Sequence, residues 1–507
     1  MAIAPKITSN IQAISTSTHL SIFLHRNYDC STFKRTYLDN MATASAHLYA
    51  KLRLMDNFTL VIFGITSNLA QIKLIPTLYD LVKGQYLNPS FRVIGVGRKE
   101  MDSTQFKEYV SHTLAAPNRH HTHPIDPQVE ADLLSRLTYF PADLTDPTSY
   151  QKLSSLLPAK TNRMFYLATF PSLFATIFKH LKASGLTDQK TSWARLLIEK
   201  PIGHDASSAG QLNQLLTQYF SEDQIFRLDH YLGKETLQNI LTFRFSNGIL
   251  EHLMNKEHIR EIQVTATEDF GIGGRGSYYD QNGALKDVGQ NHLLQMIALS
   301  LMDQPRVLSN QGITAERVKV LTHLVADPSS LIIGQYEEYQ NEKDVAEGSL
   351  TETYFAFQAD LNNDRFRGVP IYVRGGKYLA RTATEVAIIF KNSPNVLIYR
   401  IQPNEGIVLK IVTKKPGSAL DLTQSYMQYC YPHDVDLPDA YENLIIDALR
   451  GDQTFFNDAD EVDAQWTIID PLVERTHRLK PIIYPRGSWG PSSETNWLEP
   501  STAFCTI

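Results

Sequence analysis

Short apolar runs alternate with longer amphipathic stretches between residue 58 and about residue 201. Four runs have the length and β-rich composition of buried strands: "FTLVIFG" (58–64), "FRVIGVGR" (91–98), "RMFYLAT" (163–169) and "ARLLIEKP" (194–201). Between them, apolar residues recur at helical spacing, as in residues 69–81. Strands and helices in this order predict an α/β domain with a parallel sheet, whose ligands bind at the carboxyl ends of its strands.

The length of the chain and its first 54 residues indicate how it is organised. A chain of 507 residues is too long for one hydrophobic core, so two or more domains are expected. The first 54 residues are rich in Ser and Thr, and their only acidic residues are Asp29 and Asp39. This composition is typical of a transit peptide, of a disordered tail or of an over-long reading of the gene, and we expect a dispensable extension.

Net charge and cysteine content limit which binding partners and which cellular compartment are expected. A net charge of −6 argues against broad binding to nucleic acid or to anionic membranes. No apolar run is long enough to span a bilayer. Cys30, Cys430 and Cys505 are far apart and form no C-x-x-C pair, so neither a disulfide framework nor a zinc cluster is expected. A reducing compartment, the cytoplasm, is therefore predicted, with an organelle as the alternative if residues 1–54 are a transit peptide.

The ends of the first two predicted strands carry weak signals for a nucleotide. A dinucleotide fold needs glycines after its first strand, so that the backbone can approach a pyrophosphate. The stretch "GITSNLAQIK" (64–73) has Gly64, but Ser67 and Asn68 follow where a second glycine and an acidic residue are expected. After the second strand, Arg98 and Lys99 are basic, which favours the 2′-phosphate of NADP over NAD. An ordinary β–α turn and two solvated charges are the alternative interpretation.

Longer motifs give a specific signal. "EKPIGHD" (199–205) and "RLDHYLGKE" (227–235) are joined by "GRGSYYDQNGALKDVGQNHLLQ" (274–295), "RGGK" (374–377), "RIQPNEG" (400–406), "TKKPG" (413–417) and "PDAYENLIIDALRGD" (438–452). With these motifs the chain resembles the glucose-6-phosphate dehydrogenase family from about residue 57 to about residue 485. The resemblance implies oxidation of glucose 6-phosphate to 6-phosphogluconolactone with reduction of NADP, the entry step of the pentose phosphate pathway.

The resemblance also assigns site residues. His292 is implied to be the general base that removes the proton of the anomeric hydroxyl, and Asp229 to orient it; pairing with a carboxylate would raise its basicity. Hydride transfer to a nicotinamide needs no metal. The substrate-binding residues implied are His230, Tyr231, Lys234, Glu268, Asp287, Lys377 and Gln402. The cofactor-binding residues implied are Gly64, Thr66, Ser67, Asn68, Leu69, Arg98 and Lys200, the last lying between substrate and cofactor.

Three positions depart from the family pattern. The glycine loop lacks its second glycine and aspartate, since Ser67 and Asn68 stand there. Phe170 replaces the first proline of a usual Pro-Pro pair. Thr382 stands where the family commonly has Lys or Arg, and the neighbouring Arg381 is a candidate substitute. All three lie on the cofactor or phosphate side, which makes a weakened enzyme plausible.

The fold expected is a Rossmann-like α/β domain followed by a larger α+β domain with a mostly antiparallel sheet, as the resemblance implies. Alternating stretches such as "EIQVTATEDF" (261–270) agree with that sheet. We expect an extension (1–54), a dinucleotide-binding domain (55–235) and a substrate-binding and oligomerisation domain (236–507), assembled as a homodimer or homotetramer. Two other functions stay open: a catalytically silent relative that binds sugar phosphate in a regulatory role, and a dehydrogenase acting on another phosphorylated sugar or using NAD.

Overall fold

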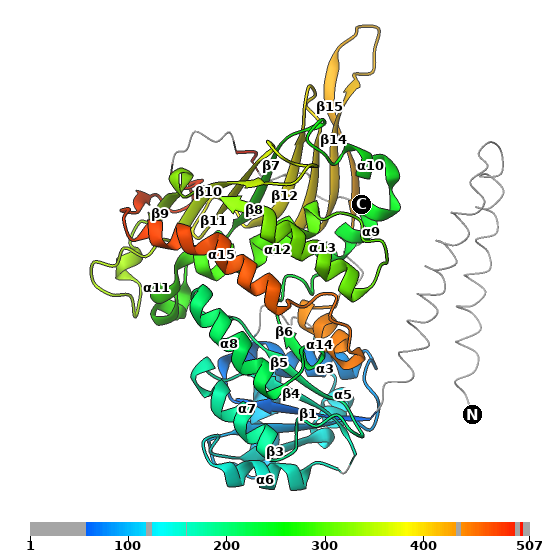
Figure 1. Cartoon of the computed structure of the whole chain (residues 1–507), viewed down its shortest axis with the longest axis vertical. Coiled ribbons are helices and arrows are strands. Elements are labelled where there is room, and N and C mark those ends of the chain that lie inside the picture. The colour runs from blue at the N-terminus through cyan, green and yellow to red at the C-terminus, as the bar shows by residue number, and fades with distance from the viewer. Residues whose placement is uncertain (1–56, 118–123, 159, 432–437, 492–496, 500–507) are drawn as a thin grey trace, which may run out of the picture. The chain divides into compact units, whose positions relative to one another are not determined.

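A computed structural model describes residues 57–117, 124–158, 160–431, 438–491 and 497–499 (Figure 1). The predicted extension (1–54) therefore lies outside the described residues, and its role stays a prediction. Within the described residues, no helix combines the length and the apolar composition that crossing a bilayer requires.

The N-terminal part of the described chain forms the predicted parallel sheet. Its six strands lie in the order β3-β2-β1-β4-β5-β6, and every neighbouring pair is parallel. Crossover connections leave from β1 in both directions along the sheet, so the strand order reverses there and creates a ligand crevice. The strands are β1 (Phe58–Phe63), β2 (Arg92–Gly97), β3 (Leu137–Pro141), β4 (Asn162–Leu167), β5 (Ala194–Ile198) and β6 (Ile225–Arg227).

Helices cover both faces of this sheet. One face carries α6 (Pro147–Leu156), α7 (Phe174–Ala183) and α8 (Ala206–Tyr219), and the other carries α3 (Ile75–Lys83), α4 (Ser103–Ala115) and α5 (Pro127–Arg136) (Figure 1). Aspartates such as Asp102 and Asp205 begin these helices by accepting hydrogen bonds from backbone N–H groups of the first turn. The core of the sheet also includes Val462 and Trp466, which belong to a helix near the end of the chain.

The C-terminal part forms a second, larger sheet. Nine of its strands lie in the order β15-β14-β13-β12-β7-β11-β10-β9-β16, and β8 pairs with β10. Pairing is antiparallel except between β7 and β11 and between β9 and β16. The strands are β7 (Ile259–Thr267), β8 (Leu324–Ala326), β9 (Ile332–Tyr336), β10 (Tyr354–Leu361), β11 (Pro370–Gly376), β12 (Ala383–Phe390), β13 (Val396–Gln402), β14 (Gly406–Lys414), β15 (Leu422–Cys430) and β16 (Ile482–Tyr484).

Helices from the second half of the chain pack against this sheet and share its main core. They include α15, which also lies along α8 of the first part. These helices are α9 (Glu235–Ser246), α10 (Gly248–Leu253), α11 (Gly276–Ala284), α12 (Leu294–Leu301), α13 (Asn310–His323) and α15 (Ala459–Thr476), with the π-helix η6 (Leu285–Leu293) between α11 and α12. The helix α14 (Ala440–Arg450) instead contacts α3 of the first part.

The structure confirms the predicted fold class and corrects two details. The run 194–201 was predicted as the fourth strand, but β3 precedes it, so that run contains β5. The strand β3 was not predicted because it contains no run of buried apolar residues; only its Leu137 is buried. The second detail concerns the cysteines: Cys430 is disulfide-bonded, which the sequence did not predict.

Candidate active site

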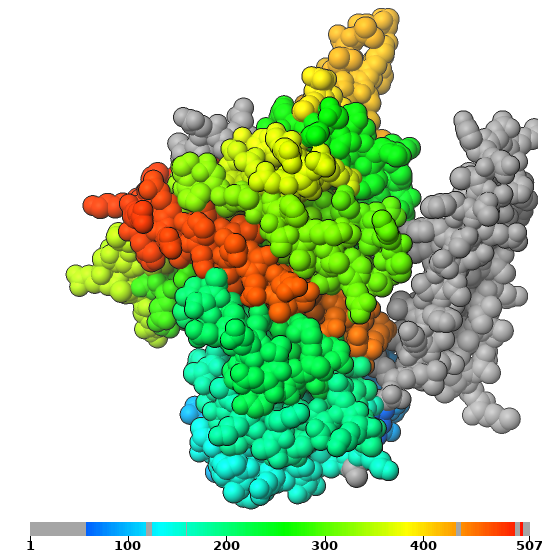
Figure 2. Space-filling view, in the orientation of Figure 1, coloured from blue at the N-terminus to red at the C-terminus, as the bar shows by residue number. Residues whose placement is uncertain are grey.

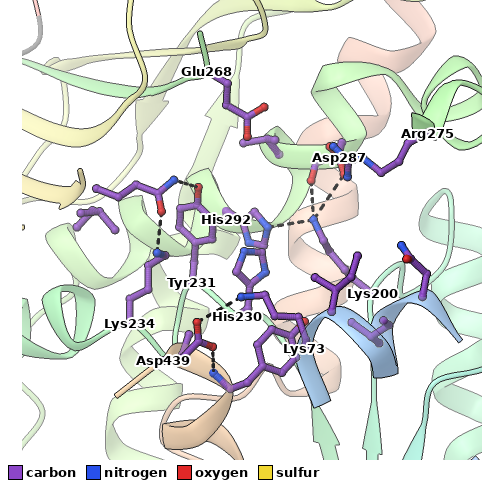
Figure 3. Close-up of a pocket in the computed structure, with 18 of the residues that line it drawn as sticks. Lys73, Lys200, His230, Tyr231, Lys234, Glu268, Arg275, Asp287, His292 and Asp439 are labelled. Carbon is purple, nitrogen blue, oxygen red and sulfur yellow. Dashed lines mark hydrogen bonds and ion pairs between the residues drawn. The ribbon is translucent and has the colours of Figure 1, made fainter. Parts of the chain in front are cut away.

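A cavity of about 1180 Å³ lies at the carboxyl ends of the parallel strands and is closed by the second sheet and its helices. The loops after β1, β5 and β6 line it together with η6 and the start of α14. Most of the residues implied by the sequence converge here (Figure 3). Those lining it are Asn68, Leu69, Lys200, His230, Tyr231, Lys234, Glu268, Asp287, His292, Lys377 and Gln402.

The predicted pair of Asp229 and His292 forms. Asp229 follows β6, and its Oδ1 lies 2.5 Å from Nδ1 of His292 on η6. Both side chains are only 2% exposed. The carboxylate accepts the Nδ1 proton, so the lone pair of the neutral ring lies on Nε2. Tyr231 stacks on the imidazole, with 4.1 Å between ring centroids, and fixes its plane.

The electrostatics of His292 differ from the expectation. Pairing with Asp229 predicted a raised basicity, but burial, followed by the positive charge of Lys200, holds the pKa of His292 well below its ordinary value of 6.5. Burial likewise raises the pKa of Asp229, which His230 and Lys200 oppose. The imidazole is therefore neutral at pH 7, which is the state that a general base needs.

Lys200 faces the reactive nitrogen of His292. Its ammonium lies 3.0 Å from Nε2 of His292, donates to the backbone oxygen of Asp287 over 2.9 Å and lies 3.6 Å from the Asp287 carboxylate (Figure 3). Burial would raise the pKa of Asp287, but Lys200 and Lys377 outweigh it and hold that pKa below its usual value. A carboxylate, an ammonium and a neutral imidazole thus stand side by side.

The helix that carries Asp287 and His292 has an unusual start. Gly283 has a φ of +68°, and a Cβ there would lie 2.2 Å from Oε1 of Glu352. The buried Glu352 carboxylate can therefore reach the first turn of η6, where it accepts from the Leu285 N–H over 3.0 Å. A π-helix widens the turn and is often found at functional sites. This geometry directs both Asp287 and His292 into the cavity.

The opposite end of the cavity is rich in donors. Lys234 donates to Oε1 of Gln402 over 2.7 Å, and Nε2 of Gln402 lies 3.2 Å from the Tyr231 hydroxyl. Burial lowers the pKa of Lys234. Burial, followed by the neighbouring His292 and Lys200 side chains, holds the pKa of His230 well below 6.5. Such a group of donors suits the phosphate of a sugar phosphate.

Glu268 and Lys377 lie at the ends of two neighbouring strands, β7 and β11, and form an ion pair. Lys377 is 3% exposed, whereas Glu268 is half-buried and reaches the cavity. The pair offers a carboxylate acceptor and an ammonium donor to a polyhydroxylated ligand.

The loop after β1 has a geometry that only glycine permits at its first position. Gly64 has a φ of +85°, and a Cβ there would lie 2.4 Å from the Ala168 backbone oxygen. The hydroxyl of Ser67 accepts from the Ala70 N–H over 3.2 Å and thereby caps the first turn of the following helix. Thr66 and Ser67 are half-buried, and Arg98 is exposed at the end of β2; none of the three, nor Gly64, lines the described cavity.

The structure also shows where the residues that depart from the family pattern lie. Phe170 is 78% exposed directly after β4. The Thr382 hydroxyl donates to Asp269 over 2.7 Å, and the Arg381 guanidinium lies 5.9 Å from the Trp489 ring. Neither Arg381 nor Thr382 lines the described cavity, so the structure gives no support to Arg381 as a substitute phosphate contact.

Sequence reasoning missed several lining residues that come from distant segments. Asp439, the N-cap of α14, and Tyr441 in its first turn line the cavity, and Arg275 lies near Asp287 (Figure 3). The Asp439 carboxylate lies 3.3 Å from the Lys73 ammonium. The motif "PDAYENL" contained Asp439 and Tyr441, but no local pattern indicated that they face the ligand.

Asp229, His230 and His292 also place possible metal-ligand atoms within 4.8 Å of one another. Their chemistry does not favour a cation, because Oδ1 of Asp229 already accepts from His292 and the Lys200 ammonium lies beside Nε2. We assign no metal to this group.

The fold and the cavity are those of a dehydrogenase with an NAD(P)-binding domain. Residues 61–239 match the family model described as glucose-6-phosphate dehydrogenase, NAD binding domain, and residues 241–504 match the model of its C-terminal domain. The chain belongs to the glucose-6-phosphate dehydrogenase family.

Individual relatives support this assignment over most of the chain. The glucose-6-phosphate 1-dehydrogenase of Bacillus subtilis strain 168 is 38% identical over 478 residues, covering 87% of this chain and 96% of that protein. The enzyme of Borreliella burgdorferi is 37% identical, covering 89% and 98%. A solved structure titled "Glucose-6-phosphate dehydrogenase in complex with its substrate glucose-6-phosphate" is 35% identical with a TM-score of 0.81, covering 87% of this chain and 96% of that one.

Proposed function

We propose that this chain oxidises glucose 6-phosphate to 6-phosphogluconolactone and reduces NADP. The observation that carries the proposal is the buried Asp229–His292 pair, whose neutral imidazole has its lone pair on Nε2 in a cavity lined by Lys200, Lys234 and Lys377. A silent relative has no need of such a base. The family membership and the relatives named above point to the same reaction.

Each residue then has a role that follows from its position. Lys234, His230 and Tyr231 hold the sugar phosphate, and Gln402 and Lys377 complete that pocket. Glu268 and Asp287 form hydrogen bonds with the sugar hydroxyls. His292 takes the proton of the anomeric hydroxyl on Nε2, and Asp229 holds the ring and balances the imidazolium that forms. Lys200 must leave Nε2 for that proton to arrive, and Asp287, at 3.6 Å, can receive its ammonium.

The residues present fit NADP. Gly64 lets the backbone approach a pyrophosphate where a Cβ would collide with Ala168, and the first turn of the next helix follows at once. Arg98, exposed directly after β2, which pairs with β1, would accept a 2′-phosphate. The nicotinamide, when bound, accepts the hydride.

Initial rates on glucose 6-phosphate test the proposal. We expect turnover with NADP and a lower kcat/KM with NAD. A higher kcat/KM with NAD would show that NAD is the cofactor. Turnover only on other sugar phosphates would show that the substrate is a different one. Binding of glucose 6-phosphate without turnover would favour a silent regulatory protein.

Lys234→Ala is expected to raise the KM for the sugar phosphate by about 10–100-fold, because it removes a charged contact of about 1.5–3 kcal/mol already made in the ground state. Turnover at saturation should change little. Steady-state kinetics check this, with Lys319→Ala, an exposed lysine of α13, as the control. An unchanged KM with weaker NADP binding would assign Lys234 to the wrong ligand.

The altered glycine loop gives a binding prediction. Ser67 adds a Cβ and a hydroxyl close to the expected pyrophosphate, so Ser67→Gly with Asn68→Asp should tighten NADP binding about fivefold, the worth of one hydrogen bond of about 1 kcal/mol. The single variant Ser67→Gly separates the steric effect from the added charge. Calorimetric titration measures both, and equal affinity for wild type and variants would show that the loop has adapted.

We also propose that the chain forms a homodimer or homotetramer through the large sheet. The hairpin of β14 and β15 stands out from the described surface (Figures 1 and 2). In β15, the edge strand, Met427 is 61% exposed and Tyr429 is 50% exposed. Such an apolar edge is typical of a contact surface.

Met427→Lys with Tyr429→Lys is therefore expected to weaken self-association at least about tenfold, which corresponds to ~1.4 kcal/mol. Sedimentation velocity over a concentration series measures it. Ile249→Lys, at an 82% exposed position of α10, is the control. Equal association of all three proteins would place the interface elsewhere.

A further inference from the structure

A second, small cavity lies next to Asp229. It leaves about 10 Å³ in which the centre of a water-sized sphere can sit, enough for one water molecule. Its walls come from the loops after β5 and β6, from η6 and from α15. The lining residues are Lys200, Ile202, Leu228, Asp229, Gln290, Asn291, Asn457, Val462 and Gln465.

Two complementary polar atoms lie in these walls without a protein partner. Oδ1 of Asp229 accepts from the Tyr231 N–H over 2.9 Å and contacts His292, but its Oδ2 is buried and has no hydrogen-bond partner among the described residues. Nε2 of Gln465 on α15 is likewise buried without a partner among them. Asp229 is 2% and Gln465 is 1% exposed. One atom is an acceptor and the other a donor, and both residues line the same cavity.

We propose that this cavity binds one ordered water molecule, which donates a hydrogen bond to Oδ2 of Asp229 and accepts one from the Gln465 amide. A buried water usually makes about three hydrogen bonds, and the side-chain amides of Asn457 and Gln290 in the same walls offer a further partner. A bound cation fits less well, because Lys200 already lies in the wall. Leaving a buried carboxylate oxygen unpaired is costly, and the water removes that cost.

The water would act on the base through Asp229. By donating to Oδ2 it stabilises the ionised carboxylate, which in turn keeps the His292 ring oriented with its lone pair on Nε2. Gln465 is then a positioning residue, and this part of the inference rests on the proposed function. The charged and titratable groups that face Asp229 are His292 on η6, His230 and Tyr231 beside it, Lys200 after β5, Arg317 on α13 and Tyr441 on α14.

A crystal structure of the full chain, at a resolution that shows ordered waters, tests the site directly. We expect one peak within hydrogen-bond distance of both Oδ2 of Asp229 and Nε2 of Gln465. The same peak should be absent in Gln465→Met, which keeps the side-chain volume but removes the donor. A dry cavity in the wild-type structure would overturn the proposal, whether or not the protein turns over glucose 6-phosphate.

The pH dependence of kcat/KM tests the effect on the base. Without the water the ionised carboxylate is less stable, so the Asp229–His292 pair binds a proton more readily. The acid limb in Gln465→Met should therefore move to higher pH by about one unit. Gln335→Met is the matched control, because Gln335 is equally buried but bonds to Ser349 and Thr351. Identical pH profiles for Gln465→Met and this control would overturn the positioning role of Gln465. If Gln465→Met does not fold, the wild-type crystal structure still shows whether the water is bound.

Discussion

Replacing His292 with asparagine is expected to lower turnover by about 10²–10⁴-fold, the usual contribution of a positioned general base. The neighbouring His230, with ring centroids 4.5 Å apart, is not expected to take over, because Asp229 pairs with His292 and not with His230. Asparagine keeps an N–H donor near the position of Nδ1, so substrate affinity should change little.

Steady-state kinetics and a direct binding measurement check this prediction together. Asp229→Asn should act in the same direction but less severely, because the base remains and only its orientation and charge balance are lost. His252→Asn, at a histidine of α10 outside the cavity, controls for the loss of a histidine. If His292→Asn turns over at close to the wild-type rate, His292 is not the general base.

The second large effect is expected on stability. Arg317 of α13 and Glu461 of α15 form an ion pair in which both side chains are 0% exposed. The guanidinium also donates to the backbone oxygens of Thr454 and Phe456 over 2.7 and 2.8 Å. Arg317→Met leaves a buried, unpaired carboxylate, which typically costs about 3–5 kcal/mol.

We expect Arg317→Met to lower the midpoint of thermal unfolding by ~3–5 °C, measured by calorimetry. Arg367→Met is the control: Arg367 lies 3.8 Å from Asp364, and both side chains are exposed. Surface pairs of this kind contribute about 0–1 kcal/mol, so the control should hardly shift. A loss in Arg317→Met no larger than in the control would show that the carboxylate becomes protonated or hydrated instead.

Most of the fold follows from local patterns, and the exceptions have physical reasons. The strands β1, β2, β4 and β5 are buried and read as apolar runs, whereas β3 is largely solvent-accessible and does not. The π-helical turns of η6 leave no signature in residue spacing, because the extra residue per turn is set by what packs around it. The large sheet was implied by the family resemblance more than by its own pattern.

Only those site residues that lie within the family motifs could be predicted from the sequence. Asp229 and His292 are 63 positions apart, and their pairing came from the resemblance, not from local sequence. The lowered pKa of His292 could not be foreseen, because it depends on burial and on the position of Lys200. Tyr441 and Gln465 were missed for the same reason: each reaches its cavity from a helix near the end of the chain.

The placement of α15 has a consequence for biosynthesis. Val462 and Trp466 belong to the core of the parallel sheet, and the Trp466 indole donates to the Ile202 backbone oxygen over 2.8 Å. On the ribosome, β1 to β6 emerge long before these residues. Part of the hydrophobic face of the first sheet therefore stays exposed until translation is nearly complete. We expect the nascent chain to bind chaperones during this time. A fragment that ends after β6 should aggregate, because this face is never covered.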